Sequence, residues 1–256
     1  VAVASGVLHA TGILVELGPV TAMQLHVGAA LLSIPFAVWH VLARRVRPRR
    51  TDLSRRSLLR AGAVVGGAGL AYMGIEGVVR ATALPGADRR FTGSYERGSG
   101  RPKDMPVTQW LDDEVPWLDP GSWRLEVASA DGVRTWTHEE VAGFTDRVRA
   151  TLDCTGGWYA EQVWEGAWLW RLLPAVGEAR SLKVVSVTGY PRRFPAADLS
   201  RLLLATRVGG RPLDPGHGFP ARLVAPGRRG FWWVKWVARV EASPVPWWWQ
   251  WPFPVT

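Results

Sequence analysis

The sequence of 256 residues contains very little cysteine, since Cys154 is its one thiol. A single cysteine cannot form an internal disulfide, and it offers too few thiolates for a zinc or iron–sulfur site built from cysteine alone. The first 43 residues contain no lysine or arginine and one acidic residue, Glu16. This stretch is about twice the ~20 residues that a helix needs to cross a bilayer. The two shortages exclude a disulfide-stapled scaffold and point to a membrane segment at the N-terminus.

The net charge of +9 is concentrated in one short segment. Residues 44–60 contain eight arginines and one acid, Asp52, whereas residues 61–256 contain 23 basic and 20 acidic side chains. Proteins that bind nucleic acids present a basic face on a folded domain, which this distribution does not predict. A hydrophobic fraction of 47% also excludes a disordered chain. We therefore expect a folded protein with no nucleic-acid partner.

Apolar runs on both sides of the arginine cluster predict a membrane protein. Residues 1–43 are expected to form two transmembrane helices, over 1–16 and 20–43, and residues 61–80 a third, with 44–60 as the loop between them. The positive-inside rule places this loop in the cytoplasm and the chain after residue 80 on the outer side of the cell membrane. Because the sequence begins at Val1 rather than Met, we expect earlier spans to precede it. The alternative is that these segments are buried helices of a soluble protein.

The arginine cluster also resembles an export signal. The run from Ser54 to Arg60 contains paired arginines and paired leucines, and a weakly hydrophobic stretch rich in alanine and glycine follows. This order is similar to a twin-arginine signal, which directs already folded proteins across the membrane. The resemblance implies that the chain after residue 84 folds around a cofactor before export. The alternative is that the arginines only stop translocation.

Three histidines, His9, His26 and His40, lie within the apolar N-terminal part, where a polar ring is costly unless it has a partner. His26 and His40 are 14 residues apart, so they share one helix face about 21 Å apart along the axis at ~1.5 Å per residue. This spacing resembles that of transmembrane b-type cytochromes and implies two b-type haems. His9 and His26 are then axial ligands of the outer haem, and His40 takes a partner from outside this sequence. The alternative is that the histidines form hydrogen bonds at the membrane interface.

The remainder of the chain predicts one globular domain. Residues 81–105 have the composition of a linker, residues 106–243 form the domain, and residues 244–256 form a Trp- and Pro-rich tail that either rests in the lipid headgroups or packs over the domain. Short β-type runs outnumber helical ones, which favours an α+β domain dominated by strands. On one predicted helix, Trp164 and Trp168 share a face and are expected to pack in the core. The strands are expected at 123–128, 135–137, 149–152, 183–187, 221–224 and 231–240, and the helices at 138–144, 161–173 and 196–205.

Two clusters in this domain carry chemistry. Cys154 follows an apolar strand and precedes a glycine pair, and a thiolate is a soft ligand suited to a transition metal. Further along, His217, Arg222 and Lys235 stand among glycines, prolines and aromatic residues. Arginine offers a bidentate fork, and lysine a point charge, for an anionic group such as phosphate. The alternatives are a small buried cysteine and a turn-rich strand pair with solvated charges.

The order of these motifs identifies a family. A Cys154 loop, a His-Gly-Phe-Pro-x-Arg-Leu-Val-x-Pro-Gly run at 217–227 and a Val-Lys-Trp strand at 234–236 follow one another along the chain. Residues 91–241 resemble the molybdopterin-binding domain of the sulfite oxidase family, which implies an α+β, strand-dominated fold, preceded here by transmembrane α-helices. The resemblance implies that Cys154 binds molybdenum, which also carries a pterin dithiolene. By the same resemblance, the residues that contact the pterin and its phosphate are Thr188, His217, Arg222, Trp233, Val234 and Lys235.

Two departures from the family pattern bear on the substrate and the oligomeric state. Sulfite oxidases follow the metal-binding cysteine with an Asn-Arg-Arg stretch that helps to bind sulfite, whereas Thr155 to Tyr159 contain no cation here. Sulfite is therefore not the expected substrate. The chain also ends without the family's immunoglobulin-like dimerisation domain, so we expect a monomeric catalytic domain. Both features are similar to small bacterial members, which include a periplasmic methionine-sulfoxide reductase that works with a haem-bearing membrane subunit.

The sequence thus predicts a membrane-anchored molybdenum oxidoreductase that faces outside. The resemblance implies oxygen-atom transfer to or from a small-molecule substrate while molybdenum cycles between Mo(VI) and Mo(IV). A haem or a quinone is the expected electron-transfer partner. Tyr159, close to Cys154 in sequence, is the candidate catalytic side chain for contact with substrate. The rival hypothesis is a non-catalytic membrane protein whose domain keeps the fold without the metal and serves in binding or assembly.

Overall fold

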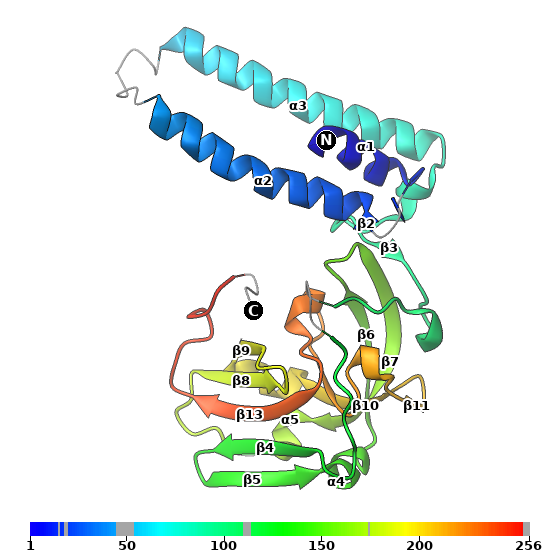
Figure 1. Ribbon diagram of the computed structural model, residues 1–256, viewed down its shortest axis with the longest axis vertical. Coiled ribbons are helices and arrows are strands. Elements are labelled where there is room, and N and C mark those ends of the chain that lie inside the picture. Colours follow the sequence, from blue (N-terminus) through cyan, green and yellow to red (C-terminus); the bar gives the residue numbers. More distant parts are fainter. Residues whose placement is uncertain (15, 18–19, 45–53, 110–113, 174, 253–256) are drawn as a thin grey trace. The chain divides into compact units, whose positions relative to one another are not determined.

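The computed structural model describes residues 1–256 except 15, 18–19, 45–53, 110–113, 174 and 253–256. These described residues form two compact units, Val1–Tyr95 and Glu96–Thr256 (Figure 1). Most of the arginine-rich loop predicted at 44–60 lies outside the described residues, and so do residues 18–19, between the helices predicted at 1–16 and 20–43. The boundary between the units falls inside the segment 81–105, which composition marks as a linker.

Three helices make up most of the first unit (Figure 1). The short helix α1 (Ala2–Thr11) contacts both of the long helices, α2 (Ala22–Ala43) and α3 (Arg55–Ala81). A pair of two-residue strands, β1 (Glu16–Leu17) and β2 (Val20–Thr21), lies between α1 and α2 in the chain. The turn η2 (Pro85–Asp88) follows α3.

Local sequence determines where α2 and α3 begin. The Thr21 hydroxyl accepts the Gln24 N–H at 3.1 Å, and the Gln24 side chain accepts the Thr21 N–H at 2.7 Å. Ser54 accepts the Ser57 N–H at 3.3 Å. Such caps satisfy N–H groups that have no partner within the helix. The paired arginines that resemble an export signal therefore form the first turn of a helix of 27 residues.

In the described part of the chain, α2 and α3 are the two helices long and apolar enough to cross a bilayer. They have 22 and 27 residues, and no residue in their most apolar 18-residue windows is buried within the protein. Helix α1 has ten residues, which corresponds to about 15 Å, or half of the hydrocarbon core. It is shorter than the span predicted over 1–16, because Gly12, with φ of 71°, ends it in a left-handed conformation.

The second unit is built around two sheets (Figure 1). A six-stranded sheet has the order β11-β10-β7-β3, with β12 paired to β10 and β6 paired to β7. A five-stranded sheet has the order β5-β4-β13-β8-β9, in which β4 and β13 are parallel and the other pairs antiparallel. The strands of the first sheet are β3 (Tyr95–Glu96), β6 (Asp146–Asp153), β7 (Trp158–Trp168), β10 (Leu203–Val208), β11 (Arg211–Pro212) and β12 (Arg222–Val224), and those of the second are β4 (Arg124–Ser129), β5 (Gly132–Thr137), β8 (Ser181–Ser186), β9 (Pro191–Pro195) and β13 (Val237–Ser243).

Helical elements in this unit are short. The helices and 3₁₀ turns are η3 (Pro102–Asp104), α4 (His138–Ala142), α5 (Leu169–Leu172), η4 (Ala196–Arg201), η5 (Pro215–His217) and η6 (Gly230–Trp232). The prediction of a strand-dominated α+β domain is therefore confirmed. The buried residues of both sheets form one hydrophobic core, in which Trp164 and Trp233 meet edge to face with ring centroids 5.4 Å apart.

Three of the predicted elements are corrected by the structure. The helix predicted at 161–173 is strand β7 followed by the four-residue α5, the helix predicted at 196–205 is η4 followed by β10, and the strand predicted at 231–240 begins only at Val237. Strand β7 forms because β6 and β10 both pair with it. Gly166 permits the second pairing, since a Cβ there would lie 2.0 Å from the Leu204 carbonyl oxygen.

The Trp-rich tail is attached to the second unit through its main chain. Arg192 donates to the Trp251 carbonyl at 2.9 Å, and the Gln250 side chain exchanges two hydrogen bonds with the main chain of β9, at 3.0 and 2.9 Å. The indoles of Trp248, Trp249 and Trp251 are nevertheless more than half exposed. The tail therefore combines hydrogen bonds to the domain, through the Gln250 side chain and the Trp251 carbonyl, with exposed tryptophans.

Candidate active site

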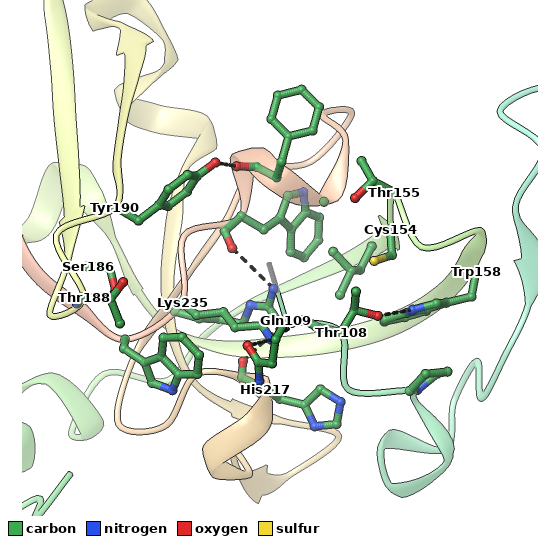
Figure 2. A pocket seen from close by; sticks show the side chains of 17 residues that line it. Thr108, Gln109, Cys154, Thr155, Trp158, Ser186, Thr188, Tyr190, His217 and Lys235 are labelled. Carbon is green, nitrogen blue, oxygen red and sulfur yellow. Dashed lines mark hydrogen bonds between the residues drawn. The ribbon is translucent and has the colours of Figure 1, made fainter. Parts of the chain in front are cut away.

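A pocket in the second unit lies beside the turn that joins β6 to β7 (Figure 2). Cys154 and Thr155 line one side of it, and Thr188 and Tyr190 line the opposite side (Figure 2). The pocket gathers segments that are far apart in the chain. Its lining consists of Pro106, Thr108, Gln109, Leu152, Cys154, Thr155, Trp158, Ser186, Thr188, Tyr190, His217, Arg222, Gly230, Phe231, Trp233, Lys235 and Trp236.

Cys154 is placed by the hairpin between β6 and β7. Its N–H donates to the Trp158 carbonyl at 2.8 Å, and its carbonyl accepts the Gly157 N–H at 3.2 Å. Gly157 has φ of 89°, a left-handed conformation that favours glycine. The Gly156 N–H lies 3.4 Å from the Cys154 sulfur and donates to it. The sequence signal of a strand followed by two glycines thus corresponds to a tight turn that presents one thiol to the pocket.

Arg222 is a buried cation in the wall of this pocket. Its side chain, on β12, donates to the carbonyls of His217 at 3.0 Å and Trp233 at 3.4 Å, and the residue is 2% exposed. Burial lowers the pKa of Arg222 to about 10, an effect that Cys154 partly opposes, so the guanidinium stays protonated at neutral pH. Its Nε has no hydrogen-bond partner, and no carboxylate pairs with it, among the residues that the structure describes. A buried cation in this state is costly until an anion joins it.

His217 lies at the end of η5 and is also buried. Neither ring nitrogen has a hydrogen-bond partner of standard geometry within the described chain. Burial lowers the pKa of His217, and the positive charges of Arg222 and Lys235 lower it further, while the Pro106 carbonyl and Asp214 oppose the change. The ring is therefore neutral at pH 7. It offers one N–H donor and one acceptor to a ligand in the pocket.

Lys235 connects two loops of the pocket. Its ammonium donates to the carbonyls of Gly216 at 2.7 Å and Thr108 at 2.9 Å, so one positive charge lies where residues 106–109 meet η5. Trp233 lines the pocket, whereas Val234 is buried and is not among the lining residues. The Val234 carbonyl accepts the Leu223 N–H at 2.8 Å. This hydrogen bond attaches the main chain of Val234 to strand β12.

Thr188 also lines the pocket, after strand β8. Its N–H donates to the Ser186 hydroxyl at 3.2 Å. Thr188, His217, Arg222, Trp233 and Lys235, which the resemblance assigned to the pterin, thus meet in one cavity with Cys154. These residues are far apart in the sequence, and the fold places them around one pocket.

Tyr159 is not among the residues that line the pocket. It is the second residue of β7, and successive side chains of a strand point to opposite faces. Trp158, one residue earlier, lines the pocket instead, and its indole N–H donates to the Thr108 hydroxyl at 2.9 Å. If strand β7 is assumed to begin directly after the two glycines, the alternation of side chains along the strand places Trp158 on the face of the pocket. Tyr190 was also missed, although it stands two residues from Thr188.

The three histidines of the first unit lie on α1 and α2. The His9 Nε2 is 2.7 Å from the Gly93 carbonyl, and the His26 Nδ1 is 2.7 Å from the Ala2 carbonyl. His40 lies in the last turn of α2 and is exposed. His9 and His26 therefore each use one ring nitrogen in a hydrogen bond. Haem ligation by these residues remains a prediction.

The charges of the pocket suit an anionic ligand. Two cations, Arg222 and Lys235, line it, and the described lining contains no aspartate or glutamate. No group of three or more His, Cys, Asp or Glu side chains that could hold a metal ion is found among the described residues. A metal at Cys154 would therefore need most of its ligands from a cofactor. The fold and the pocket define a domain with a cavity, lined by two cations and one thiol, that suits an anionic ligand.

Comparison with known proteins agrees with this description. Residues 112–251, more than half of the chain, match the family described as "Oxidoreductase molybdopterin binding domain", and the chain belongs to that family. Its second unit contains a molybdopterin-binding oxidoreductase domain similar to that of sulfite oxidase. The predictions of the family, of the molybdopterin cofactor and of an enzyme are thereby confirmed.

Individual relatives share only part of their length with this chain. Mitochondrial sulfite oxidase from Homo sapiens is 29% identical over 167 residues, which cover 51% of this chain and 31% of the relative. The NADPH nitrate reductase of Mycosarcoma maydis is 48% identical over 42 residues, 16% of this chain and 4% of the relative. Among solved structures, the sulfane dehydrogenase SoxCD from Paracoccus pantotrophus aligns with a TM-score of 0.48 and 25% identity, over 51% of this chain and 40% of that chain. The chain thus spans about a third of the length of the sulfite oxidase that it matches.

Proposed function

We propose that this chain is a membrane-anchored molybdopterin oxidoreductase in which Cys154 ligates the metal. The observation that carries the proposal is the buried Arg222, which lines the same cavity as the one thiol and has no carboxylate partner among the described residues. Arg222 and Lys235 would bind the anionic phosphate of the pterin. The neutral His217 would exchange hydrogen bonds with the pterin, since neither ring nitrogen has a hydrogen-bond partner of standard geometry among the described residues.

When bound, the cofactor supplies two-electron redox chemistry coupled to the transfer of an oxygen atom. The residues of the chain bind and orient it and limit access of water. Aromatic side chains form much of the wall, and Tyr190 is fixed because its hydroxyl donates to the Phe231 carbonyl at 2.6 Å. A low-dielectric wall strengthens the attraction between the two cations and the bound anion. The proposed role of the protein is therefore electrostatic and positional.

The substrate that this pocket favours is a small, neutral oxo compound. Sulfite oxidase and nitrate reductase, by their names, act on oxo compounds of sulfur and nitrogen. In this chain, the cations that line the pocket are Arg222 and Lys235, which the pterin phosphate would use, and the turn after Cys154 contributes none. An anionic substrate would therefore lack a partner. A sulfoxide or an N-oxide fits the lining better than sulfite does.

A substrate screen on the purified full chain tests this proposal. The protein, produced in a host that makes the cofactor, is expected to contain about one molybdenum per chain. With a reduced dye as electron donor, it is expected to turn over sulfoxides or N-oxides at least about tenfold faster than it oxidises sulfite with a dye acceptor, since one pocket contact gives discrimination of this order. A protein that remains free of molybdenum and inactive in such a host would favour the rival hypothesis of a binding or assembly role.

The proposed location is the cell membrane, with the molybdopterin domain on the outer side. The exposed apolar surfaces of α2 and α3 support it, because large apolar surfaces on a soluble monomer are rare. The arginines between these helices favour the cytoplasm for that loop. The run from Ser54 to Arg60, which begins α3, supports export through the twin-arginine route.

A haem held by the histidines of α1 and α2 is the proposed electron-transfer group. Detergent-solubilised full chain is expected to show a Soret band, which the His9→Ala/His26→Ala variant should lose while its molybdenum content is retained. His138→Ala in the second unit is the matched control and should keep the band. Full chain that binds molybdenum but shows no Soret absorption would leave a quinone as the remaining electron-transfer partner.

A further inference from the structure

The turn that carries Cys154 is held from outside by a residue 75 positions later in the chain. Arg229 Nη2 donates to the Cys154 carbonyl at 3.2 Å, and Arg229 Nη1 lies 3.3 Å from Asp153 Oδ1. The Asp153 side chain is 8% exposed and that of Arg229 is 29% exposed, so this ion pair is largely shielded from solvent. One guanidinium thus contacts two consecutive residues at the point where β6 ends.

The main chain of the same segment also lies against the turn. Asp153 and Arg229 form an isolated parallel bridge. A Cβ on Gly230 would lie 3.0 Å from the Cys154 Cα and 3.2 Å from the Asp153 carbonyl oxygen. A side chain at position 230 would therefore force these backbones apart. Gly230 itself and the nearby Phe231 and Trp233 line the pocket.

The hairpin alone gives Cys154 limited support. Two glycines, Gly156 and Gly157, follow it within the turn, and glycine allows a wider range of backbone conformations than other residues. The Cys154 carbonyl accepts one hydrogen bond from within the turn, from Gly157, and one from Arg229. The second bond fixes the plane of the peptide that follows Cys154 and so limits rotation at that residue.

We propose that Arg229 is a positioning residue that fixes the backbone of Cys154 and thereby the direction of its sulfur. This inference rests on the proposed function, in which Cys154 is the metal ligand. Arginine suits the role because its planar fork bonds a carboxylate and a carbonyl at once, which a lysine ammonium does less well. Asp153 balances the charge, so the support adds no net charge to the turn.

The reactivity of the thiol in the cofactor-free full chain tests the proposal directly. Cys154 is the one cysteine of the sequence and is 9% exposed, so a disulfide reagent such as 5,5′-dithiobis(2-nitrobenzoate) reports its local opening alone. Arg229→Gln is expected to raise the labelling rate at least about tenfold, which corresponds to about 1.4 kcal/mol in the opening equilibrium. Arg229→Lys, which retains the ion pair with Asp153, is expected to give an intermediate rate.

Arg228→Gln is the matched control. Arg228 is adjacent in the chain, its side chain is 27% exposed, and it pairs with Asp198 at 2.6 Å instead of with the turn. Its loss should change the global stability to a similar extent, because the two arginine side chains are similarly exposed. The labelling rate of Cys154 should stay within about twofold of the parent, because Arg228 pairs with Asp198 and not with the turn. In the loaded protein, the sulfur-to-metal charge-transfer absorption is expected to shift in Arg229→Gln and to stay in place in Arg228→Gln.

Equal labelling rates and equal spectra for the Arg229 and Arg228 variants would overturn the proposal and leave the hairpin as the sole support. If Arg229→Gln does not fold, the comparison of Arg229→Lys with Arg228→Lys gives the same decision. The two hypotheses also fail separately. A parent protein without thiolate-to-metal absorption overturns Cys154 as ligand, whereas the labelling of the cofactor-free chain decides the role of Arg229 on its own.

Discussion

Replacement of Cys154 by serine is expected to lower turnover at least about 10³-fold, a loss of about 4 kcal/mol of transition-state stabilisation, while most of the pterin stays bound. A serine hydroxyl is a harder and far less acidic ligand than a thiol, so it does not replace a thiolate at a transition metal. The proposed pterin contacts lie on other elements. Arg222 begins β12, and His217 and Lys235 belong to η5 and to the segment before β13. The proposed metal contact and the proposed phosphate contacts are therefore separable.

The measurement pairs activity with molybdenum and pterin content for each variant. Tyr159→Phe is the matched control, because Tyr159 lies close to Cys154 in sequence and is absent from the pocket lining. We expect its activity to stay within about twofold of the parent, since exposed or peripheral substitutions have small effects. A Cys154→Ser protein that retained full activity would show that the thiol is not the metal ligand. A large loss in Tyr159→Phe would restore the role that the sequence suggested for this side chain.

Local pattern located strands β4, β5, β6, β8 and β12 of the molybdopterin domain and failed where long-range pairing decides. Strands β4, β5 and β8 were predicted close to their observed positions, because alternating apolar residues and turn residues mark them. Residues 161–173 read as a helix because Glu161 to Leu173 combine apolar spacing with few turn residues. Pairing on both edges overrides that tendency, and it depends on Leu204 reaching Gly166, almost forty residues away. No local window contains that contact.

The candidate site was likewise predictable where local motifs mark its residues and not where contacts between distant segments decide. Its members were found from motifs, but their convergence was implied only by the family resemblance, because Cys154 follows β6 whereas Arg222 begins β12, and these two strands of one sheet do not pair with each other. The choice between Tyr159 and Trp158 depends on where the strand starts, and an error of one residue reverses the face. Arg229 gave no signal, since its contact with Cys154 spans 75 positions. The residues of the turn contain no cation, as the sequence shows, but a cation from a distant segment, Arg229, contacts this turn.

Arg222 carries the second large effect. Arg222→Met is expected to weaken binding of the molybdopterin at least about 100-fold, equivalent to about 2.7 kcal/mol, because a bidentate, charge-assisted contact with an anion is lost. The free energy of unfolding of the cofactor-free protein should change by less than about 1 kcal/mol. Removal of a buried cation without a carboxylate partner lowers the free energy of the folded state. This stabilisation offsets the cost of leaving the carbonyls of His217 and Trp233 without their hydrogen-bond donor.

The combination of weaker molybdopterin binding with an almost unchanged free energy of unfolding distinguishes a binding role of Arg222 from a structural role. Molybdenum and pterin content, measured beside urea unfolding of the cofactor-free chain, should show strong loss of the first with little change in the second. Arg222→Lys keeps a charge without the planar fork and is expected to lose about tenfold in affinity. If Arg222→Met retained its cofactor and lost several kcal/mol of stability, the guanidinium would be a structural element of β12, with its role confined to the carbonyls of His217 and Trp233. If it instead lost the cofactor and kept its stability, the pocket would be built around an anion that this guanidinium binds.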